Sequence, residues 1–150
     1  MFAFLRRVEG ERNRAYKDAA GMYTCGVGHA SGVTASTCWD QKTIDAVLAQ
    51  DVHTAATRLA VAIGPDRVNT LSDFQYAALL SFVFNSGAKA NWRVWADIRA
   101  GHLALVPGQL KLFDHVNGKP NPGLLNRRNA EIALWSGKDP LCERYPQTVA

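Results

Sequence analysis

The chain has 150 residues, 47% of them hydrophobic and 20% charged, which is the usual content of one compact globular domain and excludes a disordered chain. Its most apolar stretch, Tyr76–Phe84, is about half as long as the roughly 18 residues of a membrane span, so we expect no stable membrane insertion. A net charge of +4 favours an anionic partner, but the sequence has no motif of a nucleic-acid-binding protein, so no nucleic acid is expected.

The N-terminal end and the cysteines bear on where the protein is made. The first ten residues do not resemble a secretory signal, because their apolar block is short and their charges follow it. Cys25, Cys38 and Cys142 form no C-x-x-C pair, which argues against a zinc or redox motif. We interpret them as free, mostly buried thiols from a reducing compartment; one disulfide with a leftover thiol is the alternative for an exported protein.

The first part of the chain predicts a helix, a small sheet and a long helix. The apolar residues of 2–8 lie on one helical face, and Gly10 follows where this helix could end. Between Arg14 and Val33, glycines separate short β-type segments, which predicts a hairpin or a three-stranded antiparallel sheet. Thr37 is a candidate N-cap for a long helix that ends near residue 63.

The rest of the chain predicts a cluster of helices. Ser72 and Gln75 fit a capping box that opens a helix through Tyr76–Phe84, which is apolar on nearly every side and thus typical of a buried centre. Asn85-Ser86-Gly87 would end it. Further helices are expected from about Asn91 to Gly101, from Gln109 to His115, and from the Asn121-Pro122 start to Trp135, with Gly137 as the stop.

These elements predict an α+β fold that is mostly α and has two lobes. A small N-terminal antiparallel sheet would form one lobe over about residues 11–35, and a connecting helix would cover about 38–63. The helical lobe would comprise about 65–150 together with the N-terminal helix. A cleft between such lobes is where ligands tend to bind.

One segment carries residues suited to glycosidic cleavage. Glu9 ends the first helix, Asp18 falls in a turn of the small sheet, and Thr24 follows on the next strand. Cleavage needs one carboxylic acid to protonate the departing oxygen and a second carboxylate to support the attack. An apolar pocket would keep Glu9 protonated, while Asp18 in a polar turn would stay ionised.

Glu9, Asp18 and Thr24 lie within E-G-x7-D-x5-T-x-G-x-G-H, which resembles the catalytic signature of the phage T4-type lysozymes, a glycoside hydrolase family of muralytic endolysins. Residues 74–87 resemble the buried central helix of that family and the turn after it. Residues 122–135 resemble the G-L-x-x-R-R-x-x-E-x-x-L-W ending of its endolysin branch. The similarity thus extends over nearly the whole chain, with three motifs in order.

The resemblance implies a lysozyme-like fold and hydrolysis of the β-1,4 bond between N-acetylmuramic acid and N-acetylglucosamine in bacterial peptidoglycan. It implies that Glu9 is the general acid, that Asp18 orients or deprotonates the attacking water and that Thr24 helps to hold it. No cofactor and no metal are implied. A water between the two carboxyl groups would give inversion, and a closer pair with Asp18 as nucleophile would give retention.

Substrate contacts are predicted more broadly. Tyr16, Tyr23 and Asn85 are candidate cleft-wall residues, although packing or capping would explain them equally well. His29 is a candidate for a substrate contact, with a structural hydrogen-bonding role as the alternative. Arg128 could bind an anion. Alternatively, Arg127 or Arg128 pairs with Glu131 while the other supports the cleft.

Two other chemistries are open from the sequence. A lytic transglycosylase would use Glu9 alone, and a non-catalytic cationic wall-binding module would need neither carboxylate. For the biology, the resemblance suggests a monomeric phage endolysin made in the host bacterial cytoplasm, which reaches periplasmic peptidoglycan after membrane permeabilisation by a holin. A secreted effector with the same catalytic domain is the alternative.

Overall fold

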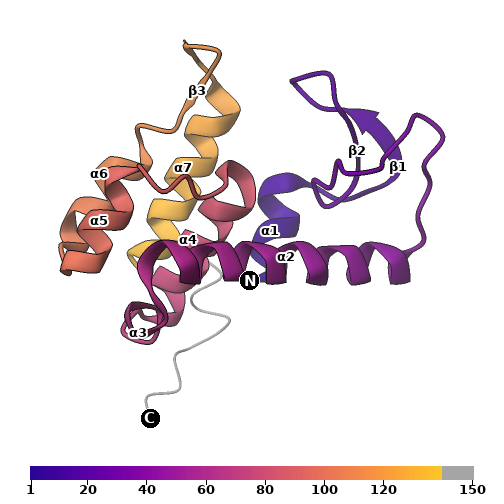
Figure 1. The fold of residues 1–150 in the computed structure, drawn as a ribbon. Helices are drawn as coiled ribbons and strands as arrows, with labels where there is room; N and C mark the ends of the chain where they lie inside the picture. Colours follow the sequence, from indigo (N-terminus) through magenta and orange to yellow (C-terminus); the bar gives the residue numbers. More distant parts are fainter. Residues whose placement is uncertain (140–150) are drawn as a thin grey trace. The chain divides into compact units, whose positions relative to one another are not determined.

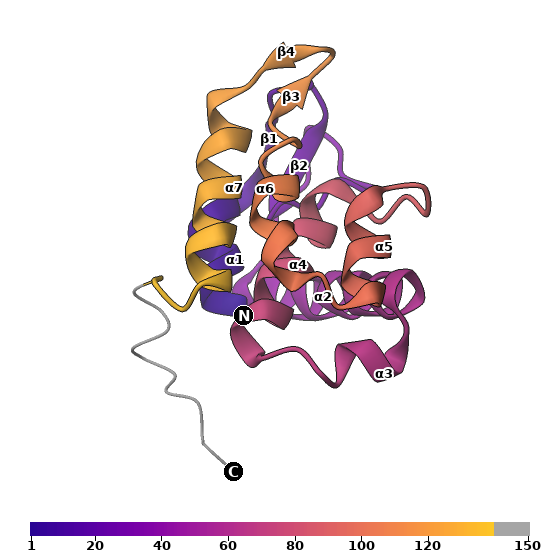
Figure 2. The same cartoon turned by 90° about the vertical axis from the view of Figure 1, so that its left-hand side faces the viewer.

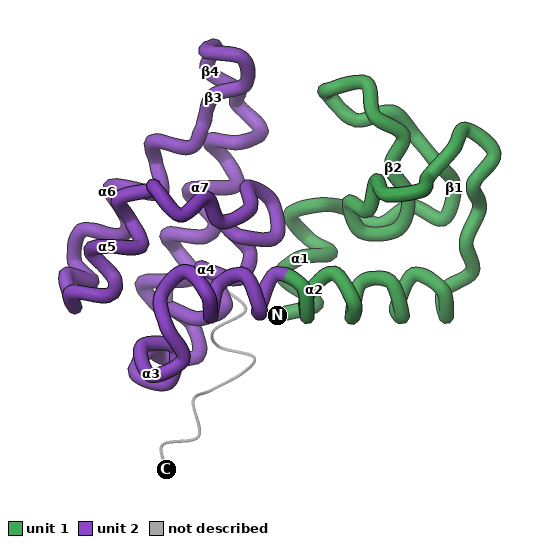
Figure 3. Tube along the Cα trace, in the orientation of Figure 1, with its two compact units in different colours: residues 1–54 green, residues 55–150 purple. Residues whose placement is uncertain are grey.

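The structure, a computed structural model, describes residues 1–139 and is mostly helical with two short antiparallel sheets (Figure 1). This confirms the predicted fold class. Contacts between residues divide the chain into two compact units, Met1–Thr54 (unit 1) and Ala55–Ala150 (unit 2), and the boundary falls inside a long helix (Figure 3). The predicted division at about residues 11–35, 38–63 and 65–150 stays a prediction.

Unit 1 begins with helix α1 (Phe2–Glu9), which ends because Gly10 adopts a φ of 75° and donates its N–H to the carbonyl of Arg6. Strands β1 (Arg12–Lys17) and β2 (Tyr23–Gly26) follow as an antiparallel pair, as the glycine-rich segment predicts. Helix α2 (Gln41–Ile63) then crosses from unit 1 into unit 2.

The predicted N-cap of α2 is wrong. Thr37 does not cap the helix; its hydroxyl accepts the N–H of Thr34 at 2.9 Å. Oδ1 of Asp40 takes the capping position and accepts the N–H of Thr43 at 2.8 Å. Hydrogen bonds from Thr43 also lower the pKa of Asp40. Both residue types are good N-caps, so local preference alone did not distinguish them.

Unit 2 is built around helix α4 (Asp73–Ser86), whose residues 78–83 are all buried and which packs against α7 (Pro122–Trp135) (Figure 2). The predicted capping box of α4 is confirmed, since Ser72 and Gln75 each accept the other's backbone N–H. Asn121 caps α7 as predicted. The remaining helices of this unit are α3 (Pro65–Val68), α5 (Arg93–Ala100), the 3₁₀ helix η1 (Leu103–Leu105) and α6 (Val106–Leu110).

The predicted helix over Gln109–His115 is wrong. Helix α6 starts earlier, at Val106, because Pro107 suits the first turn of a helix. His115 instead begins a hairpin of strands β3 (His115–Val116) and β4 (Lys119–Pro120) (Figure 2). Asn117 and Gly118 have φ values of 51° and 75° in its turn, as two-residue hairpin turns require.

The two described cysteines differ in exposure. Cys25 is buried and free, as predicted, whereas Cys38 is free but exposed, so the expectation of a buried thiol is wrong there. Cys142 lies outside the described residues. No helix within residues 1–139 is both long and apolar enough to cross a lipid bilayer.

Candidate active site

Glu9 is the last residue of α1, and its side chain lies against the turn that follows β2. A Cβ atom built on Gly28 would be 3.0 Å from Oε2 of Glu9 and 3.1 Å from its Cδ. The carboxyl group is therefore in contact with backbone that lacks a side chain.

Asp18 is held by the turn that joins β1 to β2. Its Oδ1 accepts the backbone N–H groups of Ala20 and Met22, at 2.9 Å each, and its own N–H donates to the carbonyl of Met22. In residues 1–139, Oδ2 accepts no hydrogen bond. This exposed carboxylate thus has one fixed oxygen and one oxygen able to accept from water.

Thr24 lies on β2 with only 3% of its surface exposed. Its hydroxyl donates to the carbonyl of Met22 at 3.3 Å, which leaves the oxygen's lone pairs available to accept. The backbone of Met22 therefore contacts both Asp18 and Thr24, and it sets the direction of the two side chains from one residue.

Tyr16 is the cross-strand partner of Thr24 and is partly buried. The guanidinium of Arg12 lies over its ring, 4.4 Å from the centroid. Burial raises the pKa of Tyr16, and the charges of Glu9 and Asp18 raise it further, whereas Arg12 lowers it. The phenol of Tyr16 is thus protonated near neutral pH and lies within the electrostatic range of both carboxylates.

His29 uses both of its ring nitrogens within unit 1. Nδ1 lies 2.7 Å from Oδ2 of Asp51, and Nε2 lies 2.9 Å from the carbonyl oxygen of Ser31. The ring also packs near Trp39, with 5.6 Å between centroids. These contacts support a structural role, and a substrate contact of His29 stays a prediction.

Tyr23 is the cross-strand partner of Lys17, whose Nζ lies 5.3 Å from the centre of the Tyr23 ring. Of the eight predicted site residues, unit 1 therefore contains Glu9, Asp18 and Thr24 together with Tyr16, Tyr23 and His29.

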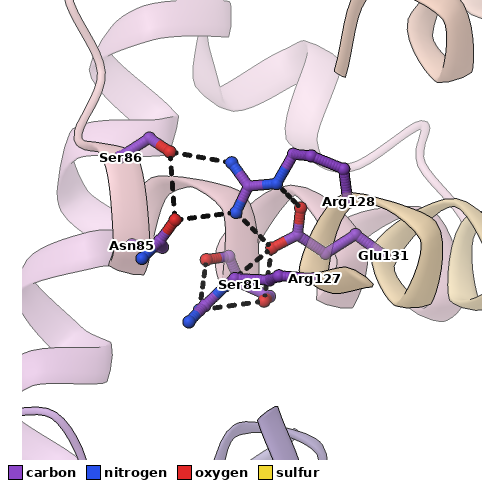
Figure 4. Close-up of polar contacts among 6 residues, drawn as sticks. All are labelled: Ser81, Asn85, Ser86, Arg127, Arg128 and Glu131. Carbon is purple, nitrogen blue, oxygen red and sulfur yellow. Dashed lines mark hydrogen bonds and ion pairs between the residues drawn. The ribbon is translucent and has the colours of Figure 1, made fainter. Parts of the chain in front are cut away.

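The other two predicted residues, Asn85 and Arg128, lie in unit 2 and contact each other (Figure 4). Nη2 of Arg128 donates to Oδ1 of Asn85, and Nη1 donates to Oγ of Ser86, both at 2.8 Å. The side chain of Arg128 is fully buried. It can therefore act on a ligand through Asn85 and Ser86, and a direct contact stays a prediction.

Glu131 joins both arginines of α7, rather than one as the alternative interpretation had it (Figure 4). Its Oε1 accepts from Ser81 at 2.8 Å and from Arg127 and Arg128 at 3.2 Å each. Nε of Arg128 lies 2.9 Å from Oε2 as an ion pair that lacks hydrogen-bond alignment. Burial raises the pKa of Glu131, and the two guanidinium groups and the Ser81 hydroxyl oppose that rise.

Asn85 opens onto a cavity of about 350 Å³ in unit 2. Because Arg128 occupies its Oδ1, the amide N–H₂ of Asn85 is oriented as a donor. The other residues lining the cavity are aromatic, aliphatic or polar: Ser86, Lys89, Trp92, Leu112, Phe113, His115 and Leu124.

Some residues of these networks were not found from the sequence. Asp51 and Ser81 had no local signal, because their partners His29 and Glu131 lie 22 and 50 positions away in the chain. Met22 contacts Asp18 and Thr24 through its backbone, which its residue type does not reveal. Within residues 1–139, no cluster of His, Cys, Asp or Glu side chains is suited to hold a metal ion.

Comparison with known proteins adds independent evidence. The family model described as "Phage lysozyme" matches residues 6–131. The chain is 36% identical over 138 residues to the endolysin of Salmonella phage P22, covering 87% of this chain and 91% of that protein. It is 31% identical over 137 residues to the endolysin of Acyrthosiphon pisum secondary endosymbiont phage 1, covering 87% of this chain and 91% of that protein. It is 32% identical over 126 residues to the SAR-endolysin of Escherichia phage Mu, covering 81% of this chain and 70% of that protein.

Solved structures share the fold. The active form of the P1 phage endolysin Lyz has a TM-score of 0.79 at 23% identity, covering 89% of this chain and 80% of that chain. A mutant of P22 lysozyme has a TM-score of 0.66 at 26% identity, with 89% and 93% covered.

Proposed function

The chain belongs to the phage lysozyme family and is a muramidase, and from this premise we propose that Glu9, Asp18 and Thr24 form its catalytic centre. In this proposal the enzyme hydrolyses the β-1,4 bond between N-acetylmuramic acid and N-acetylglucosamine. Glu9 protonates the departing oxygen, and Asp18 and Thr24 hold the attacking water.

The observation that carries the proposal is the shared anchoring of Asp18 and Thr24 on Met22. A water that attacks a sugar carbon must be oriented and partly deprotonated, and both tasks need acceptors in fixed positions. Oδ2 of Asp18 and the hydroxyl oxygen of Thr24 are such acceptors. Each side chain is held in position by Met22, because Oδ1 of Asp18 accepts the Met22 N–H and the Thr24 hydroxyl donates to the Met22 carbonyl.

The environment of Tyr16 supports the assignment of the two carboxylates. Its hydroxyl is influenced by both Glu9 and Asp18, which indicates that these two groups share one region of unit 1. A protonated phenol within electrostatic range of them offers a hydrogen-bond donor to a sugar hydroxyl or acetamido group. Tyr16 and Tyr23 are accordingly proposed as substrate contacts, together with His29, Asn85 and, through Asn85, Arg128.

Product analysis tests the reaction type. Purified sacculi digested by the wild-type enzyme should release muropeptides with reducing N-acetylmuramic acid ends, detected by mass spectrometry. Anhydro-muramyl ends would contradict hydrolysis and favour a lytic transglycosylase that uses Glu9 alone. Binding to sacculi without any released product would favour a cationic wall-binding module.

The anomer of the product tests the role of the water. An attacking water held between the carboxyl groups inverts the anomeric carbon, whereas a covalent intermediate on Asp18 retains it. We expect inversion, read by NMR of the first product formed. Retention would contradict the water-holding role of Asp18 while leaving the muramidase activity intact.

We further propose that the enzyme is a monomeric phage endolysin that acts on periplasmic peptidoglycan after a holin has permeabilised the host membrane. Support comes from the relatives that are named endolysins. Bacteria expressing the chain should keep their turbidity until chloroform permeabilises the membrane, and should then lyse. Lysis without permeabilisation would contradict this route.

A further inference from the structure

We propose that Gly28 is the positioning residue of Glu9: the missing side chain at Gly28 provides the surface on which the Glu9 carboxyl group is held for proton transfer. This inference rests on the proposed role of Glu9 as general acid. It assigns a role in catalysis to a residue that contacts the general acid Glu9 and not the substrate.

The contact involves the whole end of the Glu9 side chain. A Cβ on Gly28 would meet Oε2 at 3.0 Å, Cδ at 3.1 Å and Cγ at 3.5 Å. The first two distances are shorter than the 3.4–4 Å of ordinary van der Waals contact. The side chain of Glu9 therefore fills the space that any residue other than glycine would occupy at position 28.

The backbone at Gly28 has little room to move away. Cys25 and His29 exchange both backbone hydrogen bonds, at 2.8 and 3.1 Å, and thereby close the turn that contains Gly28. Both ring nitrogens of His29 are hydrogen-bonded as well, one of them to Asp51 on α2. A group placed at Gly28 must consequently displace Glu9 rather than the turn.

The two glycines of this turn have separate tasks. A Cβ on Gly26 would meet the ring of Trp39 at 3.2 Å, so Gly26 allows an indole to pack on the strand. Only Gly28 has Glu9 among the nearest atoms of such a Cβ, in the part of the chain that the structure describes. The G-x-G spacing thus combines one packing position with one position that contacts the acid.

Position matters for a general acid because proton transfer requires a specific distance and direction to the departing oxygen. A displacement of about 1 Å can cost roughly 10²-fold in rate. A methyl group at Gly28 is expected to rotate or push the carboxyl group without changing its chemical identity. The expected signature is a lower kcat with a KM close to that of the wild type.

The chain offers a matched control at Gly32. Gly28 and Gly32 have nearly the same φ, 73° and 70°, but a Cβ on Gly32 would meet nothing within 4 Å. Because φ is positive at both positions, an alanine is strained at either one. We expect Gly28→Ala to lower kcat on sacculi at least about tenfold, and Gly32→Ala to keep the wild-type kcat.

A second pair of variants, Gly28→Asn and Gly32→Asn, guards against misfolding. Asparagine tolerates positive φ better than alanine but still adds a Cβ. Gly28→Asn should be folded, as judged by circular dichroism and thermal melting, and should lose activity as Gly28→Ala does. Equal kcat values for the Gly28 and Gly32 variants of either type would overturn the proposal.

A double-mutant cycle tests whether the effect passes through Glu9. Glu9→Asp shortens the side chain and should lower activity in the wild-type background. In the Gly28→Ala background, where the carboxyl group is already displaced, the same change should cost less. Strictly multiplicative losses would overturn the proposal.

Failure of this inference differs from failure of the proposed function. If Glu9→Gln keeps full activity, the catalytic assignment itself is wrong. If Glu9→Gln is inactive and the Gly28 and Gly32 variants behave alike, only the positioning role of Gly28 is wrong.

Discussion

Oδ1 of Asp18 accepts the backbone N–H of Met22 at 2.9 Å, and this bond fixes the carboxylate within the short turn that joins β1 to β2. Since the carbonyl of the same Met22 accepts the hydroxyl of Thr24, the two predicted water-holding residues are oriented by one peptide segment. The turn therefore acts as a small rigid support for groups that must share a water.

Replacing Asp18 by asparagine keeps the hydrogen bonds of the turn and removes the negative charge of the side chain. The amide oxygen of Asp18→Asn can still accept the N–H groups of Ala20 and Met22, so the turn should persist. The carboxylate that polarises the water is lost, and we expect the rate on sacculi to fall by about 10² or more. Full activity in a folded variant would contradict the role of Asp18 and favour chemistry that needs Glu9 alone.

Tyr16 makes a prediction about alkaline pH. Burial, followed by the charge of Glu9, raises its pKa above the ordinary 10.0. A group with a higher pKa in the folded than in the unfolded state stabilises the fold below the unfolded pKa, and this contribution is lost as pH rises through the folded pKa. Above about pH 10, the Tm of the wild type should therefore fall more steeply than that of Tyr16→Phe. Parallel curves of Tm against pH for the two proteins would contradict a raised pKa of Tyr16.

Glu131 makes a prediction about stability. Glu131→Gln leaves Arg127 and Arg128 buried without their carboxylate, and breaking a buried ion pair in this way typically costs about 3–5 kcal/mol. Urea denaturation should show a loss of that size. Glu11→Gln is the matched control, because it removes only a partly exposed pair with Arg6, which is worth less than about 1 kcal/mol. Similar losses for the two variants would contradict the account.

Arg128 and Asn85 should act as one unit on substrate binding. Arg128→Lys removes the two-pronged contact with Asn85 and Ser86, and we expect a KM several-fold higher than that of the wild type. Asn85→Ala should have a similar effect, and the double variant should be little worse than either single variant. Independent, multiplicative increases in KM would show that Arg128 does not act through Asn85.

Elements with strong local signals were predictable from the sequence. The capping box at Ser72 and the Asn121-Pro122 start of α7 were found because their hydrogen bonds are made within one helical turn. The β3–β4 hairpin was not predicted, because its strands have only two residues each and the predicted helix ran on to His115, the first residue of β3. The N-cap of α2 was misplaced because two suitable capping residues lie three positions apart.

The site was predictable in its composition but not in its contacts. The spacing of Glu9, Asp18 and Thr24 was visible in the sequence. The contact of Glu9 with Gly28 and that of His29 with Asp51 depend on how α1, the turn after β2 and α2 pack. No local pattern encodes such contacts, since the partners lie 19 and 22 positions apart in the chain.

The most direct test of the central claim compares two Glu→Gln variants on purified sacculi. Glu9→Gln keeps the shape of the side chain and removes its ability to donate a proton as an acid, and Glu11→Gln makes the same change two positions away. We predict that Glu9→Gln binds sacculi but does not reduce their turbidity, whereas Glu11→Gln lyses them as the wild type does. Full lysis by Glu9→Gln would contradict the assignment of Glu9 as the general acid.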